Sequence, residues 1–175
     1  MQENFKLAQF ETPIVQIPDE NNEIFIKRND SQVDIVYTEL LTFLTKIDML
    51  FPVPLSKKES LATLASKLKT YGTISFIRDQ DKIVSMCAGY TNNLRNKLGY
   101  ISVVATLPEY SGKGYGKRAV QDFIENAKKA GMSEVHLYAD SENRAALHMY
   151  EKLGFSDWKV AGEPRPNDRH LIKKL

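Results

Sequence analysis

The sequence predicts a single α/β domain, spanning residues 1–175, in which helices pack on a mixed β-sheet. Three observations predict it. A strand, a glycine-rich loop and a helix follow one another over residues 100–131, an apolar hairpin precedes that unit, and a further strand and helix follow it. The chain is also long enough to bury a core that excludes water.

Composition and charge disfavour several classes of protein. A hydrophobic content of 42% and a charged content of 26% are those of an ordinary globular protein, and a net charge of +2 does not favour nucleic-acid binding. The first ten residues lack the apolar core of a signal peptide, and no run reaches membrane-spanning length. We therefore expect no membrane partner and a cytoplasmic location. The single cysteine, Cys87, lies in an apolar run and is expected to be a small core residue.

The N-terminal part is expected to hold an irregular arm and a first helix. Residues 1–22 show no periodic pattern, and residues 24–27 are a short strand candidate. Polar residues at 29–31 offer N-caps for a helix whose apolar positions recur at helical spacing. These positions are Val33, Val36, Leu40, Phe43, Leu44 and Ile47.

An apolar loop with two prolines separates this helix from the next. Pro52 and Pro54 disfavour helical geometry, so the first helix must end near residue 51. Ser56, with Glu59 three residues later, predicts a capping box at the start of a second helix. The apolar stripe of that helix comprises Leu61, Leu64, Leu68 and Tyr71.

The strands are predicted from runs of apolar and β-branched residues bounded by turn residues. Residues 73–78 and 82–90, joined by a polar turn, predict a hairpin. The strands before and after the helix of the 100–131 unit should be parallel neighbours, because a crossover of that length returns the chain in the same direction. Beyond the hairpin, strands are predicted at residues 101–106, 134–139, 155–160 and 170–172.

The loop between residues 106 and 118 points to an anion site. Gly112, Gly114 and Gly116 leave backbone N–H groups uncovered, and a helix begins directly after them, with Val120, Phe123, Ile124 and Ala127 on its apolar face. Lys113 and Lys117 add positive charge at the same end. The pattern therefore favours a phosphate or pyrophosphate ligand.

Two common phosphate loops do not match. A Walker A loop needs Ser or Thr after Gly-Lys and a glycine five residues before the second one, whereas Arg118 and Ser111 stand at those positions. A dinucleotide-binding loop needs G-x-G-x-x-G, whereas this chain has G-x-G-x-G. Nucleotide hydrolysis and nicotinamide chemistry both lose support.

Two patterns in order resemble the GNAT superfamily of N-acetyltransferases. The run P-E-Y-x-G-K-G-x-G-K resembles motif A, although Ser111 stands where the family has Gln or Arg. The run N-x-x-A-x-x-x-Y-x-x-x-G-F, from Asn143 to Phe155, looks like motif B. Taken alone, the second run is also that of an amphipathic helix capped by Asn143 with Tyr150 in its core. The resemblance covers residues 100–155.

The resemblance implies a fold and a cosubstrate. The fold would be a mixed β-sheet of about six to seven strands flanked by about four helices. The cosubstrate would be acetyl-CoA, with its pantetheine arm held by the backbone of Val104, Ala105 and Thr106 and by Asn143. The loop residues expected to hold its pyrophosphate are Ser111, Gly112, Lys113, Gly114, Tyr115, Gly116 and Lys117.

The implied activity is transfer of an acetyl group from acetyl-CoA to a primary amine, the acceptor being a small molecule. Tyr150 would donate a proton to the departing thiolate as the general acid. The general base stays open among Glu109, His136, Tyr138, Asp140 and His170. The loop at residues 51–55 is either an acceptor contact or an apolar hinge. No spacing of ligands suggests a metal.

A second class of function remains open. Ser111 departs from the family pattern, so the chain could instead be a catalytically silent GNAT-fold module that binds or senses coenzyme A. Tyr150 favours the active enzyme. Because members of the family often dimerise, a homodimer is a further possibility.

Overall fold

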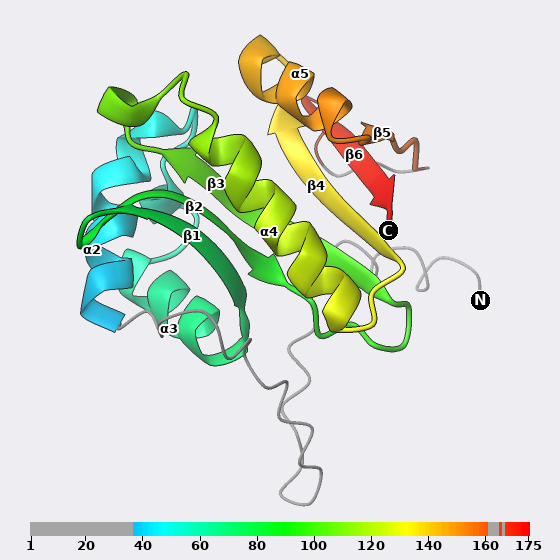
Figure 1. Cartoon of the computed structure of the whole chain (residues 1–175), viewed down its shortest axis with the longest axis horizontal. Helices are drawn as coiled ribbons and strands as arrows, with labels where there is room; N and C mark the ends of the chain where they lie inside the picture. The colour runs from blue at the N-terminus through cyan, green and yellow to red at the C-terminus, as the bar shows by residue number, and fades with distance from the viewer. Residues whose placement is uncertain (1–36, 161–164, 166) are drawn as a thin grey trace, which may run out of the picture.

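The computed structural model describes residues 37–160, 165 and 167–175. Several expectations lie outside these residues: the irregular arm at 1–22, the strand candidate at 24–27, the N-caps at 29–31, and Val33 and Val36. The described residues form one mixed sheet with helices on both faces (Figure 1).

The sheet has six strands in the order β1-β2-β3-β4-β6-β5. All neighbours pair antiparallel except β3 and β4, which are parallel as the sequence predicted. The strands are β1 Thr73–Asp79, β2 Lys82–Tyr90, β3 Leu98–Thr106, β4 Glu134–Asp140, β5 Ser156–Asp157 and β6 Asp168–Lys174.

Four α-helices cover the sheet, so the expected mixture of strands and helices is confirmed within the described residues. The helices are α2 Tyr37–Ile47, α3 Leu61–Tyr71, α4 Tyr115–Lys129 and α5 Arg144–Lys152, with short 3₁₀ turns η1 Asp48–Leu50, η2 Leu55–Lys57 and η3 Pro108–Tyr110. α2 and α3 pack on one face, and α4 and α5 on the other (Figure 1). Across the described residues no helix is both long and apolar enough to cross a membrane.

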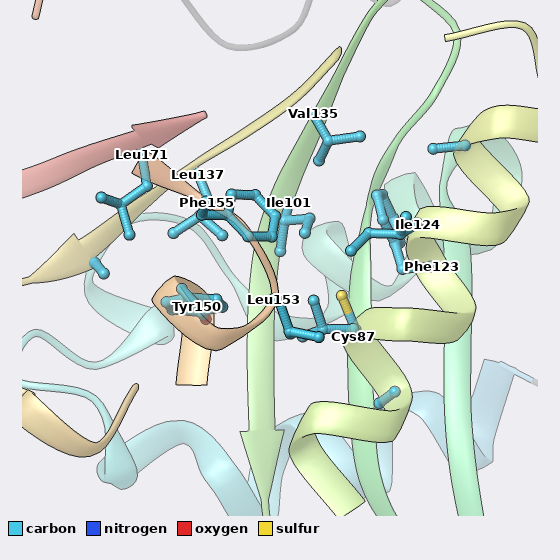
Figure 2. Packing of buried hydrophobic residues seen from close by; sticks show 14 of the residues in the cluster. Cys87, Ile101, Phe123, Ile124, Val135, Leu137, Tyr150, Leu153, Phe155 and Leu171 are labelled. Atoms are coloured by element: carbon cyan, nitrogen blue, oxygen red, sulfur yellow. The ribbon is translucent and has the colours of Figure 1, made fainter. Parts of the chain in front are cut away.

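The apolar core is divided by the sheet into two clusters. One cluster joins α4 and α5 to the sheet and contains Phe123, Leu137, Leu171 and Cys87, which is fully buried as expected (Figure 2). The other joins α2 and α3 to the opposite face. In α2 the described part of the predicted stripe is buried, since Leu40, Leu44 and Ile47 are inaccessible to solvent. The periodicity in the sequence therefore identified the correct helix faces.

A β-bulge lies in the middle of the sheet. The register of β2 on β3 shifts between Ala88 and Gly89, so that Ala88 is opposite Val103 and Gly89 is opposite Ile101. Gly89 is required there, because a Cβ atom would overlap the carbonyl of Tyr100 and lie 2.9 Å from Cα of Ile101. Beyond the bulge the side chains of β3 change faces, which is why Ile101 and Val103 belong to different clusters.

The parallel pair β3–β4 is closed at one end and open at the other. The two strands are paired only from Leu98 to Ile101 on β3 and from Glu134 to Leu137 on β4. Past the bulge they separate toward the end of the sheet that carries the α4 loop and α5 (Figure 1). The backbone of β3 after Ile101 therefore has no strand partner on its β4 side within the described part of the chain.

Two predictions about elements were wrong. Ser60, not Ser56, is the N-cap of α3, where its hydroxyl accepts a hydrogen bond from the N–H of Thr63 at 3.1 Å. Ser56 lies in η2, where Asp48 accepts hydrogen bonds from its N–H at 2.9 Å and its hydroxyl at 2.7 Å. Because the carboxylate of Asp48 is the stronger acceptor, the Ser-x-x-Glu pattern forms no capping box here.

The strand expected at residues 155–160 is also shorter than predicted. Only Ser156 and Asp157 pair with β6. After one further hydrogen bond, from the N–H of Trp158 to the carbonyl of His170, the described chain leaves the ladder. The indole of Trp158 packs instead on His170, with ring centroids 4.7 Å apart.

Candidate functional site

A cavity of about 490 Å³ lies at the open end of the β3–β4 pair. Its walls come from the loop between α2 and α3, from β3, from the end of β4, from the start of α5 and from the segment before β6. The residues expected to bind acetyl-CoA that line it are Val104, Ala105, Thr106, Ser111 and Asn143, and Tyr150 lines it too. The separation of the two strands thus creates the space in which these residues meet.

The glycine loop lies on the surface beside this cavity, with only Ser111 among its lining residues. Gly112 and Gly114 have φ values of 77° and 80°, which favour glycine, and nothing lies within 4 Å of a Cβ placed on either. Gly114 is the N-cap of the 15-residue helix α4 and offers no side-chain acceptor to its first N–H groups. The start of α4 therefore presents uncapped donors toward open space.

Lys113 and Lys117 are exposed at the same end of α4. The ammonium of Lys113 lies 5.0 Å from the ring centroid of Tyr110. Gly116 is the tightest position of the loop, since a Cβ there would be 3.2 Å from Oγ1 of Thr106. The first turn of α4 therefore passes close to the end of β3.

Tyr150 projects from α5 into both the core and the cavity. Its ring packs on Phe155 at a centroid distance of 5.7 Å, and only 6% of the residue is exposed (Figure 2). Burial raises the pKa of the Tyr150 hydroxyl, and the nearby thiol of Cys87 raises it further when charged. The hydroxyl therefore keeps its proton throughout the neutral pH range.

Asn143 has two roles in the structure, since it caps α5 and contributes to the cavity wall. Its side-chain oxygen accepts a hydrogen bond from the N–H of Ala146 at 3.1 Å, which caps α5. Asn143 also lines the cavity.

Apolar and aromatic side chains form another part of the cavity wall. Phe51, Pro52, Val53 and Leu55 of the α2–α3 loop line it, so most of the residues that the sequence singled out there do reach the cavity. Tyr100 and Tyr138 add two aromatic side chains from the sheet. Burial raises the pKa of the Tyr100 hydroxyl, while the charge of Arg165 and a hydrogen bond with it lower that pKa.

Four charged side chains also line the cavity: Lys58, Asp140, Arg165 and Asp168. The guanidinium of Arg165 lies 4.6 Å from the ring centroid of Tyr138. Asp140 ends β4 and is the register partner of Asp168 on β6, and its carboxylate accepts a hydrogen bond from the N–H of Glu142 at 2.9 Å. Lys58, Arg165 and Asp168 formed no recognisable motif in the sequence, because they come from two segments that are far apart in the chain.

Two histidines considered as bases form a buried pair behind the cavity. Nδ1 of His136 and Nε2 of His170 lie 2.9 Å apart, and neither residue lines the cavity. Burial and the charge of His170 lower the pKa of His136 to about 3. His170 stacks on Tyr138 at 4.1 Å, so the pair supports a wall of the cavity.

The three other candidates for the general base differ in position, since Glu109 lies outside the cavity lining. The carboxylate of Glu109 is exposed and pairs with Lys82 at 2.9 Å. Tyr138 and Asp140 do reach the cavity. No cluster of three or more potential metal ligands occurs among the residues that the structure describes.

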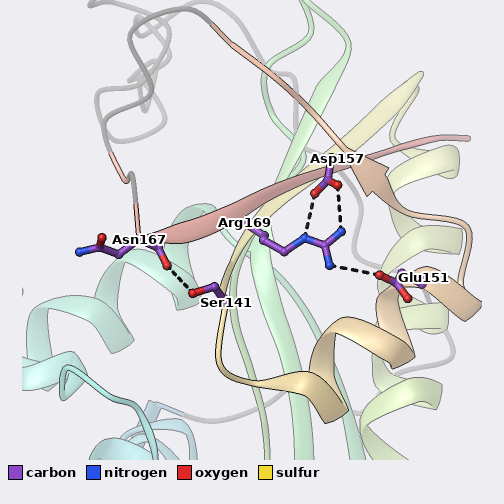
Figure 3. A network of polar contacts seen from close by, with 5 residues as sticks. All are labelled: Ser141, Glu151, Asp157, Asn167 and Arg169. Atoms are coloured by element: carbon purple, nitrogen blue, oxygen red, sulfur yellow. Dashed lines mark hydrogen bonds and ion pairs between the residues drawn. The ribbon is translucent and has the colours of Figure 1, made fainter.

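A polar network fixes the elements around the far wall. Arg169 of β6 donates to both carboxylate oxygens of Asp157, at 2.9 and 3.0 Å, and to Glu151 of α5 at 3.1 Å (Figure 3). The hydroxyl of Ser141 donates to the carbonyl of Asn167 at 2.9 Å. These bonds tie β5, α5 and the loop after β4 to the chain that enters β6.

Comparison with known proteins agrees with this architecture. The chain matches the model of the acetyltransferase (GNAT) family over residues 40–155. Mycothiol acetyltransferase from Nocardiopsis dassonvillei is 35% identical over 88 residues, which are 46% of this chain and 26% of that protein. The mycothiol acetyltransferase of Kocuria rhizophila is 40% identical over 63 residues, 36% of this chain and 21% of that protein. The chain thus spans about a quarter of the length of these relatives.

Solved structures share the fold at low identity. The PaiA N-acetyltransferase from Thermoplasma acidophilum, in complex with coenzyme A, aligns with a TM-score of 0.64 and 17% identity, covering 82% of this chain and 97% of that one. A GNAT-family acetyltransferase from Staphylococcus aureus aligns with a TM-score of 0.65 and 17% identity, over 82% and 97% of the two chains.

Proposed function

The chain belongs to the acetyltransferase (GNAT) family, and on that premise we propose that it transfers an acetyl group from acetyl-CoA to a primary amine of a small molecule. The observation that carries the proposal is that two features meet in one cavity and a third lies directly beside it on the glycine loop. The first two are the unpaired backbone of β3 and the buried hydroxyl of Tyr150, and the third is the uncapped start of α4.

The residues present fit acetyl-CoA. A pyrophosphate would interact with the N–H groups at the start of α4, with the open space above Gly112 and Gly114 and with the charges of Lys113 and Lys117. The pantetheine arm would lie along Val104 to Thr106 in the gap between β3 and β4, and Asn143, which also lines the cavity, would bond to it. Bound acetyl-CoA supplies an acyl group activated as a thioester.

Tyr150 is proposed as the general acid. Its raised pKa keeps the hydroxyl protonated at neutral pH, so it has a proton to donate to the sulfur that leaves. Low exposure excludes water from this donor. The α2–α3 loop and the two tyrosines opposite would hold the acceptor on the other side of the gap.

The acceptor amine must be neutral to react, although an alkylamine is mostly charged at pH 7. Asp140 is the carboxylate in the cavity that ends the parallel strand, so it is the described residue best placed to accept the proton, directly or through water. Glu109, His136 and His170 are outside the cavity lining and are not proposed as bases.

The second candidate function is a silent module that binds or senses coenzyme A. It is favoured by Ser111, which lines the cavity with a short side chain. The two functions differ in turnover and not in binding, so an assay of thiol release separates them.

The first experiment is a thermal shift with acetyl-CoA, ATP and NAD at equal concentrations. Saturation at about 100 times Kd should stabilise the protein by about 2.7 kcal/mol. A shift with acetyl-CoA alone supports the proposed site, and release of thiol with a panel of amines then supports the transferase over the silent module. An equal shift with ATP would overturn the assignment of the loop to acetyl-CoA.

We further propose a single domain over residues 1–175 and a cytoplasmic location. Limited proteolysis would test the first by asking for one resistant fragment, and fractionation would test the second. A homodimer is a related proposal that light scattering would test.

A further inference from the structure

The four charged side chains that line the cavity come from segments far apart in the sequence. Lys58 follows η2, Arg165 and Asp168 lie before and at the start of β6, and Asp140 ends β4. The N–H of Asp168 donates to the carbonyl of Arg165 at 3.1 Å, which fixes these two residues on one turn. The hydrogen bond from Ser141 to Asn167 anchors the same turn (Figure 3).

With Asp140 assigned to the amine in the proposed function, the remaining group of Lys58, Arg165 and Asp168 has two positive charges and one negative charge. Lys58 makes no ion pair within 4.0 Å with any described residue. Desolvation lowers its pKa although part of the side chain is exposed, the charge of Arg165 lowers it further, and Asp168 raises it. Two cations therefore line the same cavity close enough to influence each other, with the carboxylate of Asp168 nearby.

A bound anion would relieve this arrangement. It would offset the repulsion between Lys58 and Arg165 and provide a partner for a partly desolvated ammonium. The planar guanidinium of Arg165 is held over the ring of Tyr138, an orientation that suits a carboxylate or a phosphate.

Resting on the proposed function, we propose that the acceptor is an amine that also carries an anionic group, and that Lys58 and Arg165 bind that group. The apolar loop at Phe51 to Leu55 covers the rest of the molecule. A polycationic amine would bring further positive charge to these two side chains and is disfavoured.

The experiment compares matched acceptors with acetyl-CoA saturating. Leucine is paired with leucinamide and with 3-methylbutylamine, O-phosphoethanolamine with ethanolamine, and spermidine is the polycation. Leucinamide keeps the shape of leucine, and the lower pKa of its ammonium leaves more of its amine neutral at a given pH. A preference for leucine over leucinamide therefore cannot come from the amount of neutral amine. We expect kcat/KM to be at least about tenfold higher for the anionic member of one series, and that series identifies carboxylate or phosphate.

The variants Lys58→Ala and Arg165→Gln should reduce this preference to nearly one, mainly through KM. Lys57→Ala is the matched control, because Lys57 is the exposed neighbour and does not line the cavity. It should leave the preference unchanged. All variants should retain the thermal shift with acetyl-CoA, which shows that they are folded.

The outcomes separate this inference from the function on which it rests. Turnover that favours neutral amines or spermidine, or a preference that survives both substitutions, overturns the inference and leaves the transferase intact. Binding of acetyl-CoA without turnover of any amine overturns the transferase and the inference together.

Discussion

The two ends of the β3–β4 pair differ in almost every property. At the closed end, Leu98–Ile101 and Glu134–Leu137 form an ordinary parallel ladder backed by core residues. At the open end, β3 continues beside β2 alone, and the gap is lined by polar, charged and aromatic side chains. The closed end stabilises the sheet, whereas the open end gives up strand pairing and gains a cavity.

β3 belongs to both ends of the pair, and the bulge opposite Gly89 separates its two parts. The bulge at Gly89 rotates the second half of β3, so that residues after it are presented differently from those before it. A bulge next to a site of this kind commonly redirects side chains and ends pairing. The junction between the ends is therefore the most sensitive point of the sheet.

Gly89→Ala should have the largest effect on stability, because it introduces a steric clash where the closed and open ends of β3 meet. The added Cβ meets the backbone of Tyr100 and Ile101, which cannot move without breaking the central ladder. We expect the free energy of unfolding to fall by at least about 4 kcal/mol, measured by urea denaturation. Gly131→Ala, at φ 82° in open space, should cost only about 1 kcal/mol. Equal losses would refute the role of close approach.

Tyr150→Phe tests the chemistry of the open end. We expect kcat to fall by about 100-fold while Kd for acetyl-CoA changes little, because only the proton donor is lost. In the wild type, activity should not decline between about pH 8 and 10 through ionisation of Tyr150, since its pKa is raised above the ordinary value near 10. Full activity of the variant in a thiol-release assay would exclude the acid role.

Acid should destabilise the wall behind the cavity through His136. Its pKa is lowered to about 3 in the folded protein, whereas the unfolded chain takes up a proton near pH 6.5. The unfolded state thus binds more protons as pH falls between these values, and stability is lost. From pH 7 to 5 the loss should be about 2 kcal/mol, by urea denaturation. His136→Asn should flatten that dependence, and an unchanged slope would show that another group titrates.

Gly114→Ala would sharpen the comparison at the start of α4. Its methyl group would stand in the open space assigned to the pyrophosphate, so we expect Kd for acetyl-CoA to rise about tenfold, or 1.4 kcal/mol. Gly131→Ala has nearly the same φ, at the other end of the same helix, and should leave Kd unchanged. Calorimetric titration of both variants decides whether the loop binds the ligand.

Ser60→Ala should have the smallest effect, on the helix that leads away from the cavity loop. Losing the cap of α3 should lower the free energy of unfolding by about 1 kcal/mol. Ser56→Ala removes instead the hydroxyl bond to Asp48 in an exposed turn. If only Ser56→Ala lowered the thermal midpoint, the cap would be assigned to the wrong serine.

The sequence predicted the region of α4 and α5 far better than the charged part of the cavity wall. Glycine spacing, the apolar face of α4 and the Asn143–Tyr150 spacing are local features, and local periodicity identifies them. The isolated Gly89 within an apolar strand is the kind of local signal that indicates a bulge. The charged part of the cavity wall forms only when the fold brings Lys58 close to Arg165 and Asp168, and no local pattern in the sequence encodes that.

The capping error has a similar cause. Ser56 and Glu59 satisfy a local rule, but Asp48, eight residues earlier, captures both donors of Ser56. The shortened β5 likewise reflects the attraction of the Trp158 ring to two distant histidines. In each case a contact made by the tertiary fold outweighs the local propensity.

The position of β6 has a consequence for synthesis of the chain. β6 lies between β4 and β5 in the sheet, although it follows both in the chain. A ribosome therefore releases β4, α5 and β5 while the hydrogen-bonding edge of β4 is still bare. Such an edge is a template for pairing with another polypeptide, and closing it requires the late strand to enter between two elements already made. This half of the sheet can be completed only after Asp168–Lys174 has emerged, and until then the edge of β4 is open to pairing with another chain.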